Sequence, residues 1–524
     1  MNKAYIITHK PEILLFAGIV LFFLAQLIFV VDPVPHGDGH EYMLMMESLL
    51  NHGTPALKVI DLHTFKAMIS RYQEWQTYSK HWLPGELMPF LLQERKLHDF
   101  KLGYMALRNK QGRTRFLSTH FWGYSLAAIP VRLILQLLGV DERFTFQVFN
   151  VLLVLLLLAY LFFLSPLPRS FTLWFGVAFC LSPVYWYISW PHPETYTAVL
   201  TALALVFVFE KRFHPAVLCA SLAATQNLPL VLLAGCILLI ALVERPRLKR
   251  LLTLSLCLLP MLLSLGYFQL NFGTPSAIAT FDGTSLKFLT LDRYISFFID
   301  LNQGLIIAMP VMLLAFVIFY LADSVRAFRR RDPRWLLGLV FYLMIALCIQ
   351  TLNFNMGQNY VVRYAAWLAV IPLAYVIFFL NREKKLVKAL LVLFLVSQLY
   401  LAGYSRAMSN RAKFMNCEHK KWTRWLLRHY PQCYNPIPEI FIERTTHIDG
   451  YSHWHEPVIF YDKQGNLAKA AVSAQHRDRV TVPGMSQKRL AAIAATRRAR
   501  EGWIYIHARD LDATADTGSP SPAN

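Results

Sequence analysis

The sequence predicts an all-α polytopic membrane protein with about eleven transmembrane helices and a small α+β domain at its C-terminal end. Three observations support this fold class. Of the 524 residues, 56% are apolar and only 16% are charged, which is far from the balance of soluble proteins. Apolar runs of about twenty residues, the length of a bilayer-crossing helix, recur up to residue 403. Beyond that residue the pattern changes to short helices and strands.

The expected spans follow one another with short connections. They cover residues 13–31, 147–164, 171–190, 194–210, 214–228, 230–243, 251–270, 303–322, 335–352, 364–380 and 387–403. The stretch 214–243 is too long for one span, and the residues 226–229 interrupt it with Gln, Asn, Leu and Pro. We therefore expect a tight helical hairpin there.

Basic residues mark the connections between these spans. Lys plus Arg exceed Asp plus Glu by 52 to 32, but the excess is scattered, which disfavours nucleic-acid binding. Positively charged loops face the cytoplasm, so we expect that side for Lys3, Lys10 and the loops at 211–212, 244–250, 326–334 and 381–385. The segment 119–138 carries Arg132 and either crosses the membrane or lies along the interface. We prefer the interfacial helix, because it leaves every basic loop inside and the C-terminus outside.

The expected domains follow from this topology. Residues 1–403 form the transmembrane module, with a long extracytoplasmic first loop at 32–119. Residues 404–511 form an extracytoplasmic domain, and the Ala-, Ser-, Thr-, Asp- and Pro-rich residues 512–524 are expected to be disordered. Within the domain we expect helices at 411–430 and 486–501, a β-hairpin at 458–461 and 467–472, and a strand at 503–507.

Two carboxylates lie directly beyond the first span, in the sequence HGDGHEYMLMMESLL at 36–50. Asp38 and Glu41 are spaced as on one face of a helix start. Carboxylates at the membrane surface are costly unless they have a function, so we expect a general base that deprotonates an acceptor group. The alternative is a helix N-terminal capping box. His36 and His40 flank the pair and are weak candidates for a divalent metal site, although no cofactor is required.

Further candidates lie on the same side of the predicted membrane. His192 and Glu194 open the span at 194–210, and Glu194 is either a helix-start charge or a second carboxylate of the site. His120 begins the segment at 119–138 beside aromatic residues that either form a membrane belt or stack on a sugar. Arg363 follows a polar turn that includes Asn359 and precedes Tyr364. Its guanidinium either binds a lipid phosphate bidentately or extends to the interface.

Five segments together resemble the GT-C superfamily of integral-membrane glycosyltransferases. They are GDGHEYMLMMESLLNHG at 37–53, THFWGYSLAAIP at 119–130, LSPVYWYISWPHPE at 181–194, LNQGLIIAMPVMLL at 301–314 and NMGQNYVVRYAAWLAVIPL at 355–373. The resemblance implies that an acidic residue of the first loop acts on the acceptor, which falls on Asp38 with Glu41 as partner. It also implies a basic residue for the donor phosphate, which falls on Arg363. The acidic pair is D-x-x-E here, unlike the adjacent D-E of the protein mannosyltransferases.

The resemblance implies an inverting transfer of a monosaccharide from a polyprenyl-phosphate donor to an extracytoplasmic lipid, glycan or protein. It also implies a role in cell-envelope glycans at a bacterial inner (plasma) membrane. Two alternatives stay open. One is a flippase or transporter of lipid-linked sugars, which should show internal repeats or matching broken helices. The other is a surface-glycan polymerase or ligase, which would need a larger cleft.

Overall fold

The computed structural model describes residues 9–31, 33, 38–70, 104–108, 114–244, 248–281, 283–329, 332–354, 361–379, 385–404, 418–448 and 454–512. The chain divides into two compact units. The helical unit comprises Met1–Thr284, Met309–Cys348 and Tyr364–Arg411. The mixed unit comprises Ser285–Ala308, Ile349–Arg363 and Ala412–Asn524. It thus contains the expected C-terminal domain together with two segments that precede it in the sequence.

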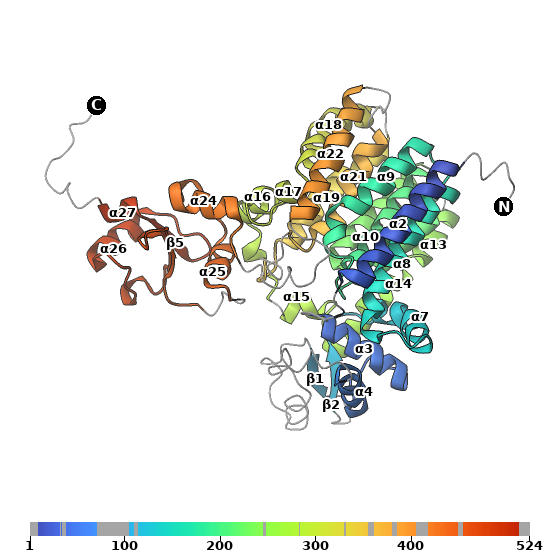
Figure 1. Cartoon of the computed structure of the whole chain (residues 1–524), viewed down its shortest axis with the longest axis horizontal. Helices are drawn as coiled ribbons and strands as arrows, with labels where there is room; N and C mark the ends of the chain where they lie inside the picture. The colour runs from blue at the N-terminus through green and yellow to red at the C-terminus, as the bar shows by residue number, and fades with distance from the viewer. Residues whose placement is uncertain are drawn as a thin grey trace. The chain divides into compact units, whose positions relative to one another are not determined.

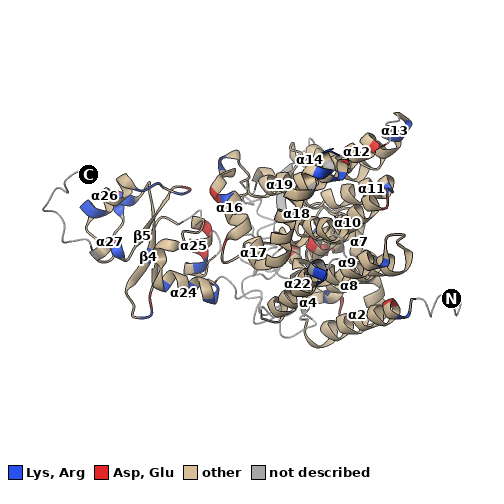
Figure 2. Ribbon diagram, turned by 90° about the horizontal axis from the view of Figure 1, so that it is seen from above, with Lys and Arg blue, Asp and Glu red and all other residues tan. Residues whose placement is uncertain are grey.

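Apolar helices lie side by side in the helical unit (Figure 1). They are α2 (Lys10–Phe29), α8 (Thr145–Ala159), α9 (Arg169–Leu181), α10 (Glu194–Phe209), α11 (Phe213–Ala224), α12 (Val231–Glu244), α13 (Leu248–Leu256), α14 (Leu259–Phe272), α18 (Pro310–Arg329), α19 (Leu336–Cys348), α20 (Ala365–Leu368), α21 (Val370–Phe379) and α22 (Lys385–Tyr404). Helix α10 is buried along almost its whole length and packs against α8, α11, α20 and α21. Figure 2 shows these helices mostly tan, with the charged residues chiefly near helix ends.

Few of these helices match the full length of the expected spans. Among the described residues, Lys10–Phe29 and Glu142–Leu164 are long and apolar enough to cross a membrane, and α13 with α14 would add a third as one bent span. The other apolar helices are shorter. Proline explains several of the breaks, because it lacks a backbone N–H and ends the preceding helix. Pro183 follows the end of α9, Pro229 separates α11 from α12, and Pro310 begins α18.

Contacts between connections define one end of the helical unit, which we call the basic end. Arg169, at the start of α9, bonds to Glu12 at the start of α2. The Tyr160 hydroxyl, beyond α8, donates to Glu210 at the end of α10 over 2.6 Å. Further pairs join the remaining connections at this end: Lys211 with Glu244 at 3.8 Å, Arg250 over the Phe213 ring, and Arg334 over the Phe378 ring. Successive long helices therefore run alternately toward and away from the basic end.

Helix α7 (Gly123–Leu137) begins and returns at the opposite end. The Gln226 side chain, between α11 and α12, donates to the Phe121 carbonyl just before α7. Arg132 of α7 pairs with Glu47 of α3 (Gly39–His52) at 3.0 Å and with Glu142, just before α8, at 3.2 Å. Figure 1 draws α7 beside α3 and α4 (Val59–Ser70), below the long helices. Whether 119–138 crosses a membrane or lies along its interface stays a prediction.

A short β-hairpin of the helical unit lies next to the chain between α3 and α4. Strand β1 (Tyr104–Arg108) pairs antiparallel with β2 (Thr114–Ser118), with Tyr104 opposite Ser118. A further bridge joins Leu57, between α3 and α4, to Phe116. These strands were not predicted from the sequence. They carry the chain directly into residues 118–120.

The mixed unit is built around a three-stranded antiparallel sheet in the order β3-β4-β5. The strands are β3 (Val458–Tyr461), β4 (Leu467–Ser473) and β5 (Trp503–His507), which confirms the expected hairpin and strand. Its helices include α16 (Leu291–Ile299), α17 (Leu305–Ala308), α24 (Lys421–His429), α25 (Pro438–Thr446) and α26 (Gln487–Thr496). Helix α26 is shorter than the expected 486–501, and residues 411–417 of the other expected helix lie outside the described residues.

The C-terminal part of the mixed unit binds the two earlier segments through buried polar groups. Arg293 of α16 is fully buried and donates to Glu501 over 2.8 Å and to the Ile349 carbonyl over 3.2 Å. Asn302 accepts from the Lys420 backbone N–H over 3.1 Å. The Trp422 indole donates to the Leu301 carbonyl over 2.7 Å. A buried group that loses its partner keeps its desolvation cost, so these contacts hold the segments together.

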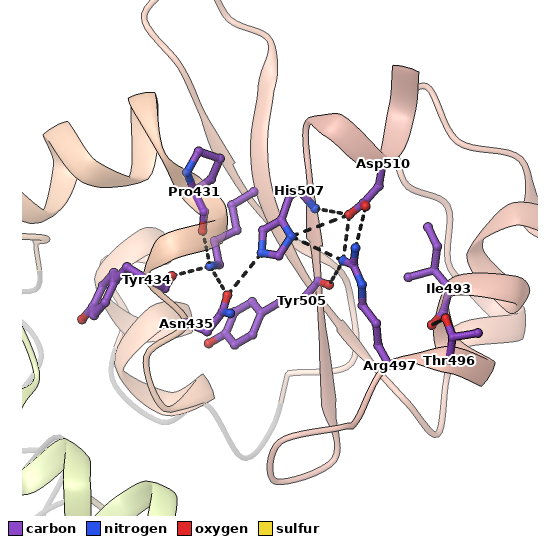
Figure 3. Close-up of polar contacts among 10 residues, drawn as sticks. Pro431, Tyr434, Asn435, Ile493, Thr496, Arg497, Tyr505, His507 and Asp510 are labelled. Atoms are coloured by element: carbon purple, nitrogen blue, oxygen red, sulfur yellow. Dashed lines mark hydrogen bonds and ion pairs between the residues drawn. The ribbon is translucent and has the colours of Figure 1, made fainter. Parts of the chain in front are cut away.

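A second polar cluster lies beside the sheet, in the view of Figure 3. The Lys469 amine of β4 is buried and donates to the carbonyls of Pro431 and Tyr434 and to the Asn435 side chain. Burial lowers the pKa of Lys469 to about 6. His507 lies between Arg497, 3.4 Å from Nδ1, and Asn435, 3.2 Å from Nε2. An arginine can only donate, so Nδ1 is an acceptor and the ring is neutral.

This neutral ring predicts a pH-dependent stability of the mixed unit. Burial, and then the positive charges of Lys469 and Arg497, lower the pKa of His507 to about 4, whereas an unfolded histidine titrates near 6.5. The unfolded chain therefore binds the extra proton more readily, and the stability that His507 contributes is lost as the pH falls from about 6.5 to about 4. After correction for the intrinsic exchange rate, which falls as the pH is lowered, hydrogen exchange of residues 418–512 in the full-length chain should be faster at pH 4.5 than at pH 6.

Two variants separate His507 from the carboxylates that titrate in the same range. His507→Gln should reduce the acceleration of exchange between pH 6 and pH 4.5. His429→Gln, which changes an exposed histidine on α24, should leave it unchanged. Lys469 titrates near pH 6 in the folded chain, but it does so in the wild type and in both variants, so the difference between them reports His507. An identical pH response in the wild type and in His507→Gln would contradict the prediction.

Candidate active site

Asp38 and Glu41 lie at the start of α3 with very different exposure. The Asp38 side chain is 33% exposed and the Glu41 side chain 1%. Asp38 occupies the N-cap position, but its side chain makes no capping hydrogen bond to α3. The D-x-x-E pair is therefore not a capping box in this structure. Of the two carboxylates, Asp38 is the one that a substrate can reach.

Gly39 brings the start of α3 against the chain that precedes α10. A Cβ atom on residue 39 would lie 2.4 Å from Cγ of Pro191, which is closer than real side chains approach. Glycine therefore permits the contact, and the contact places Asp38 beside residues 192–194. This role of Gly39 was not predicted from the sequence.

Asn150 of α8 binds the backbone of the segment that precedes α10. Its amide donates to the carbonyls of Ile188, over 3.2 Å, and Trp190, over 2.7 Å. Its oxygen accepts from the hydroxyl of Tyr124 over 3.1 Å. These bonds pair backbone carbonyls that lie between two helices, where no ladder is available for them. Sequence reasoning missed Asn150, although a lone asparagine in an apolar span is an available signal.

Glu41 contacts the Nδ1 side of the His120 ring. Its Oε1 lies 2.8 Å from His120 Nδ1 and also accepts from the hydroxyl of Ser118. The His120 backbone N–H donates to the same hydroxyl over 2.8 Å. Strand β2 ends at Ser118, so the hairpin places Ser118 and His120 against α3. A buried carboxylate that fixes one ring nitrogen determines which way the other nitrogen points.

Asp38 lies between two histidines. Its Oδ2 is 3.8 Å from His120 Nε2 and 3.8 Å from His192 Nδ1. His192 Nδ1 is in turn 3.7 Å from Oε2 of Glu194, which is 1% exposed. We call the five residues Glu41, His120, Asp38, His192 and Glu194 the acid–imidazole chain, because carboxylates and imidazoles alternate along it. Of these residues, Asp38, His120 and His192 lie more than seventy positions from one another in the sequence.

Aromatic rings form one wall of the acid–imidazole chain. The Tyr42 ring lies 5.2 Å from the His120 ring and 6.0 Å from the His192 ring, measured between centroids. Tyr124 packs edge-on against Tyr42 at 5.4 Å. Both tyrosines are buried. They exclude water from one side of the chain, and a low dielectric strengthens the charge interactions within it.

A buried ion cluster supports α3 one to two turns beyond the site. Arg132 is 6% exposed and contacts both Glu47 and Glu142, which are also buried. Burial raises the pKa of Glu47, and the charge of Arg132 opposes that rise. The arginine that made the 119–138 segment difficult to interpret is therefore neutralised by two carboxylates from α3 and from the chain before α8.

The other predicted site residues are placed less completely. His40 lies on α3, with its ring 6.3 Å from that of Phe65, and His36 lies outside the described residues. No three His, Cys, Asp or Glu side chains in the described part of the chain are grouped as a metal site. Because His36 is not described, the divalent-metal hypothesis stays a prediction.

The residues expected to bind the donor belong to the chain around α20. Arg363 is half-buried and falls in the mixed unit, whereas Tyr364 is the N-cap of α20 in the helical unit. The Tyr364 ring lies 5.5 Å from that of Trp367. Asn359 lies outside the described residues. The expectation that Arg363 binds the donor phosphate therefore stays a prediction.

The chain matches no protein-family model, no curated protein and no solved structure. The functional argument therefore depends on the geometry of the site.

Proposed function

We propose that this chain is an integral-membrane glycosyltransferase of the GT-C type, which transfers a monosaccharide from a polyprenyl-phosphate donor to an extracytoplasmic acceptor with inversion. The observation that carries the proposal is the position of Asp38. Its carboxylate is partly exposed, lies between two imidazoles, and follows α2 at the end of the helical unit opposite the basic end. A base in that position suits an acceptor that arrives from outside the membrane.

The alternation of helix directions supports a polytopic topology. The proposed eleven crossings are α2, α8, α9, α10, α11, α12, α13 with α14, α18, α19, α20 with α21, and α22. The connections rich in Lys and Arg gather at one end, which the positive-inside rule assigns to the cytoplasm. Eleven crossings that begin in the cytoplasm end on the other side of the membrane. The mixed unit is then extracytoplasmic, and the proposed location is a bacterial inner membrane.

The proposed reaction is a single displacement at the sugar C1. The acceptor group loses its proton to a carboxylate oxygen of Asp38 as its own oxygen or nitrogen bonds to C1. The bond between C1 and the phosphate oxygen breaks, and the polyprenyl phosphate leaves with that electron pair. One displacement inverts the configuration at C1. The protein needs to supply a base, orientation and charge stabilisation of the phosphate, and Arg363 is the candidate for that stabilisation.

The deciding experiment is a transfer assay with the purified full-length chain in lipid nanodiscs. A panel of polyprenyl-phosphate monosaccharides, each carrying a radiolabelled sugar, is incubated with extracted lipid, glycan and protein acceptors. We expect label to become bonded to one acceptor class. The new bond should survive the mild acid that cleaves the glycosyl phosphate of the donor. A flippase would move the labelled lipid across a vesicle without forming a new bond, and a polymerase or ligase would require a diphosphate-linked donor. Either result would replace the proposed function.

The topology makes a separate prediction. Single cysteines at Lys249 or Arg329 should react with a membrane-impermeant maleimide only after permeabilisation of intact cells, because these residues are at the basic end. A cysteine at Asn466, in the β3–β4 turn, should react without permeabilisation. The background is a chain whose native cysteines are replaced by serine or alanine. Labelling of all three sites under the same condition would refute the proposed crossings.

A further inference from the structure

His120 presents both ring nitrogens to carboxylates. Nδ1 lies 2.8 Å from Glu41 and Nε2 lies 3.8 Å from Asp38. A neutral imidazole has a single N–H and can donate to only one of them, whereas a protonated ring donates from both nitrogens. His192 differs, because the same nitrogen, Nδ1, faces both Asp38 and Glu194. The geometry therefore favours a positive charge on His120.

We infer that His120 is held as an imidazolium between Glu41 and Asp38, and that this charge keeps Asp38 ionised so that it can accept a proton. His120 is then a positioning residue, and Ser118 and Glu41 fix its ring. The inference deepens the proposed base role of Asp38 and rests on that role for its catalytic meaning.

The charges around Asp38 explain why such a cation is needed. His120 and His192 face it directly, with Glu41 and Glu194 behind them. On α3 itself the titratable neighbours are His40 and Tyr42, and Tyr124 of α7 lies beyond Tyr42. Each imidazole thus separates Asp38 from a second carboxylate, and like charges on both sides favour a protonated, inactive Asp38. One imidazolium between two of these carboxylates offsets this repulsion.

The size of the effect follows from the distance. An opposite charge about 4–6 Å away typically lowers the pH at which a carboxyl group ionises by about 1–3 units. Without that charge, Asp38 would accept a proton from solvent at a higher pH and would be a base in a smaller fraction of the molecules. A charge on His120 is therefore detectable as a shift in the pH at which Asp38 becomes protonated.

The test measures the protonation of Asp38 without any substrate. A water-soluble carbodiimide adds to a protonated carboxyl group, and glycine methyl ester then displaces the urea to form an amide. The full-length chain in nanodiscs is labelled in this way between pH 4 and pH 8. Mass spectrometry of the peptide that contains Asp38 gives the pH at half-maximal labelling. The variants are His120→Gln, which removes the charge, His120→Lys, which keeps a cation, and the matched control His192→Gln.

We expect His120→Gln to raise the half-labelling pH of Asp38 by about 1–3 units, and His192→Gln to raise it by clearly less. His120→Lys should return it toward the wild-type value, which a role of the ring in packing alone would not do. The inference is overturned if His120→Gln causes no rise, if the two glutamine variants shift equally, or if lysine restores nothing.

The labelling needs neither donor nor acceptor, so it can fail independently of the proposed function. A chain with no transfer activity can still show the shift, which would leave the charge on His120 established and the reaction wrong. Conversely, a chain that transfers sugar and shows no shift in His120→Gln would remove this inference alone.

Discussion

Asp38→Asn is expected to leave the protein folded and inserted but to lower the rate of sugar transfer by about 10²–10⁴-fold, the usual contribution of a general base. Asparagine has nearly the same shape and keeps one oxygen toward His120 and His192, but its amide does not accept a proton at neutral pH. The measurement is the initial rate of label transfer in nanodiscs, normalised to the amount of monodisperse protein.

A matched control is Asp332→Asn at the basic end. Asp332 is also a partly exposed N-cap aspartate, with a side chain 23% exposed, and it pairs with Arg334. Its variant loses a similar charge far along the helices from Asp38 and should retain the wild-type rate. If Asp38→Asn keeps near wild-type turnover, the base assignment is wrong and Glu41 becomes the candidate. If both variants lose activity equally, the loss is not specific to the site.

Arg132→Met is expected to cause the largest loss of stability, about 3–5 kcal/mol in the free energy of unfolding, as for other buried ion pairs that lose one partner. Methionine fills similar space in α7 but leaves Glu47 and Glu142 buried side by side without their cation. The measurement is thermal denaturation of the chain in detergent, monitored by loss of the monodisperse peak. Because protonation of both glutamates removes the two unpaired charges, the difference from wild type should shrink as the pH is lowered.

Arg212→Met is the corresponding control. Arg212 pairs with Glu210 at 3.4 Å, and its side chain is 53% exposed although Glu210 is buried. Glu210 would keep the hydroxyls of Tyr160 and Ser165 as partners, so we expect a change of only about 0–1 kcal/mol. A small change in Arg212→Met beside a large one in Arg132→Met would identify burial as the cause. A small change in both would show that α7 tolerates the loss of its arginine and that the ion cluster is not needed to hold α3.

The local parts of this fold were predictable from the sequence because their signals are local. Alternating apolar residues around the turn at 462–466 predicted the hairpin of β3 and β4, which the structure confirms. The break at 226–229 likewise predicted the separation of α11 from α12. The β1–β2 hairpin was missed, although Gly112 lies between its strands in the sequence, because two strands of five residues give a weak signal beside the long apolar runs of this chain.

The candidate site was predictable residue by residue but not as an arrangement. Asp38, His120 and His192 were each selected because they carry chemistry near an expected membrane surface. Nothing in the sequence states that one Asp38 oxygen lies 3.8 Å from both imidazoles, because that contact joins segments which periodicity does not relate. The supporting residues Asn150 and Gly39 have the same explanation: their roles exist only once α8 and α3 meet the turn before α10.

The composition of the mixed unit has a consequence for how the gene can be divided. Arg293, Leu301 and Asn302 find their partners in Glu501, Trp422 and Lys420, some two hundred to one hundred and twenty positions later. A stop codon after α22 would therefore strip these buried groups of their partners and leave two unfinished stretches between helices. The C-terminal residues are thus not an appendage that can be trimmed, exchanged or expressed alone. They complete a folded unit whose first segment is synthesised more than a hundred residues earlier.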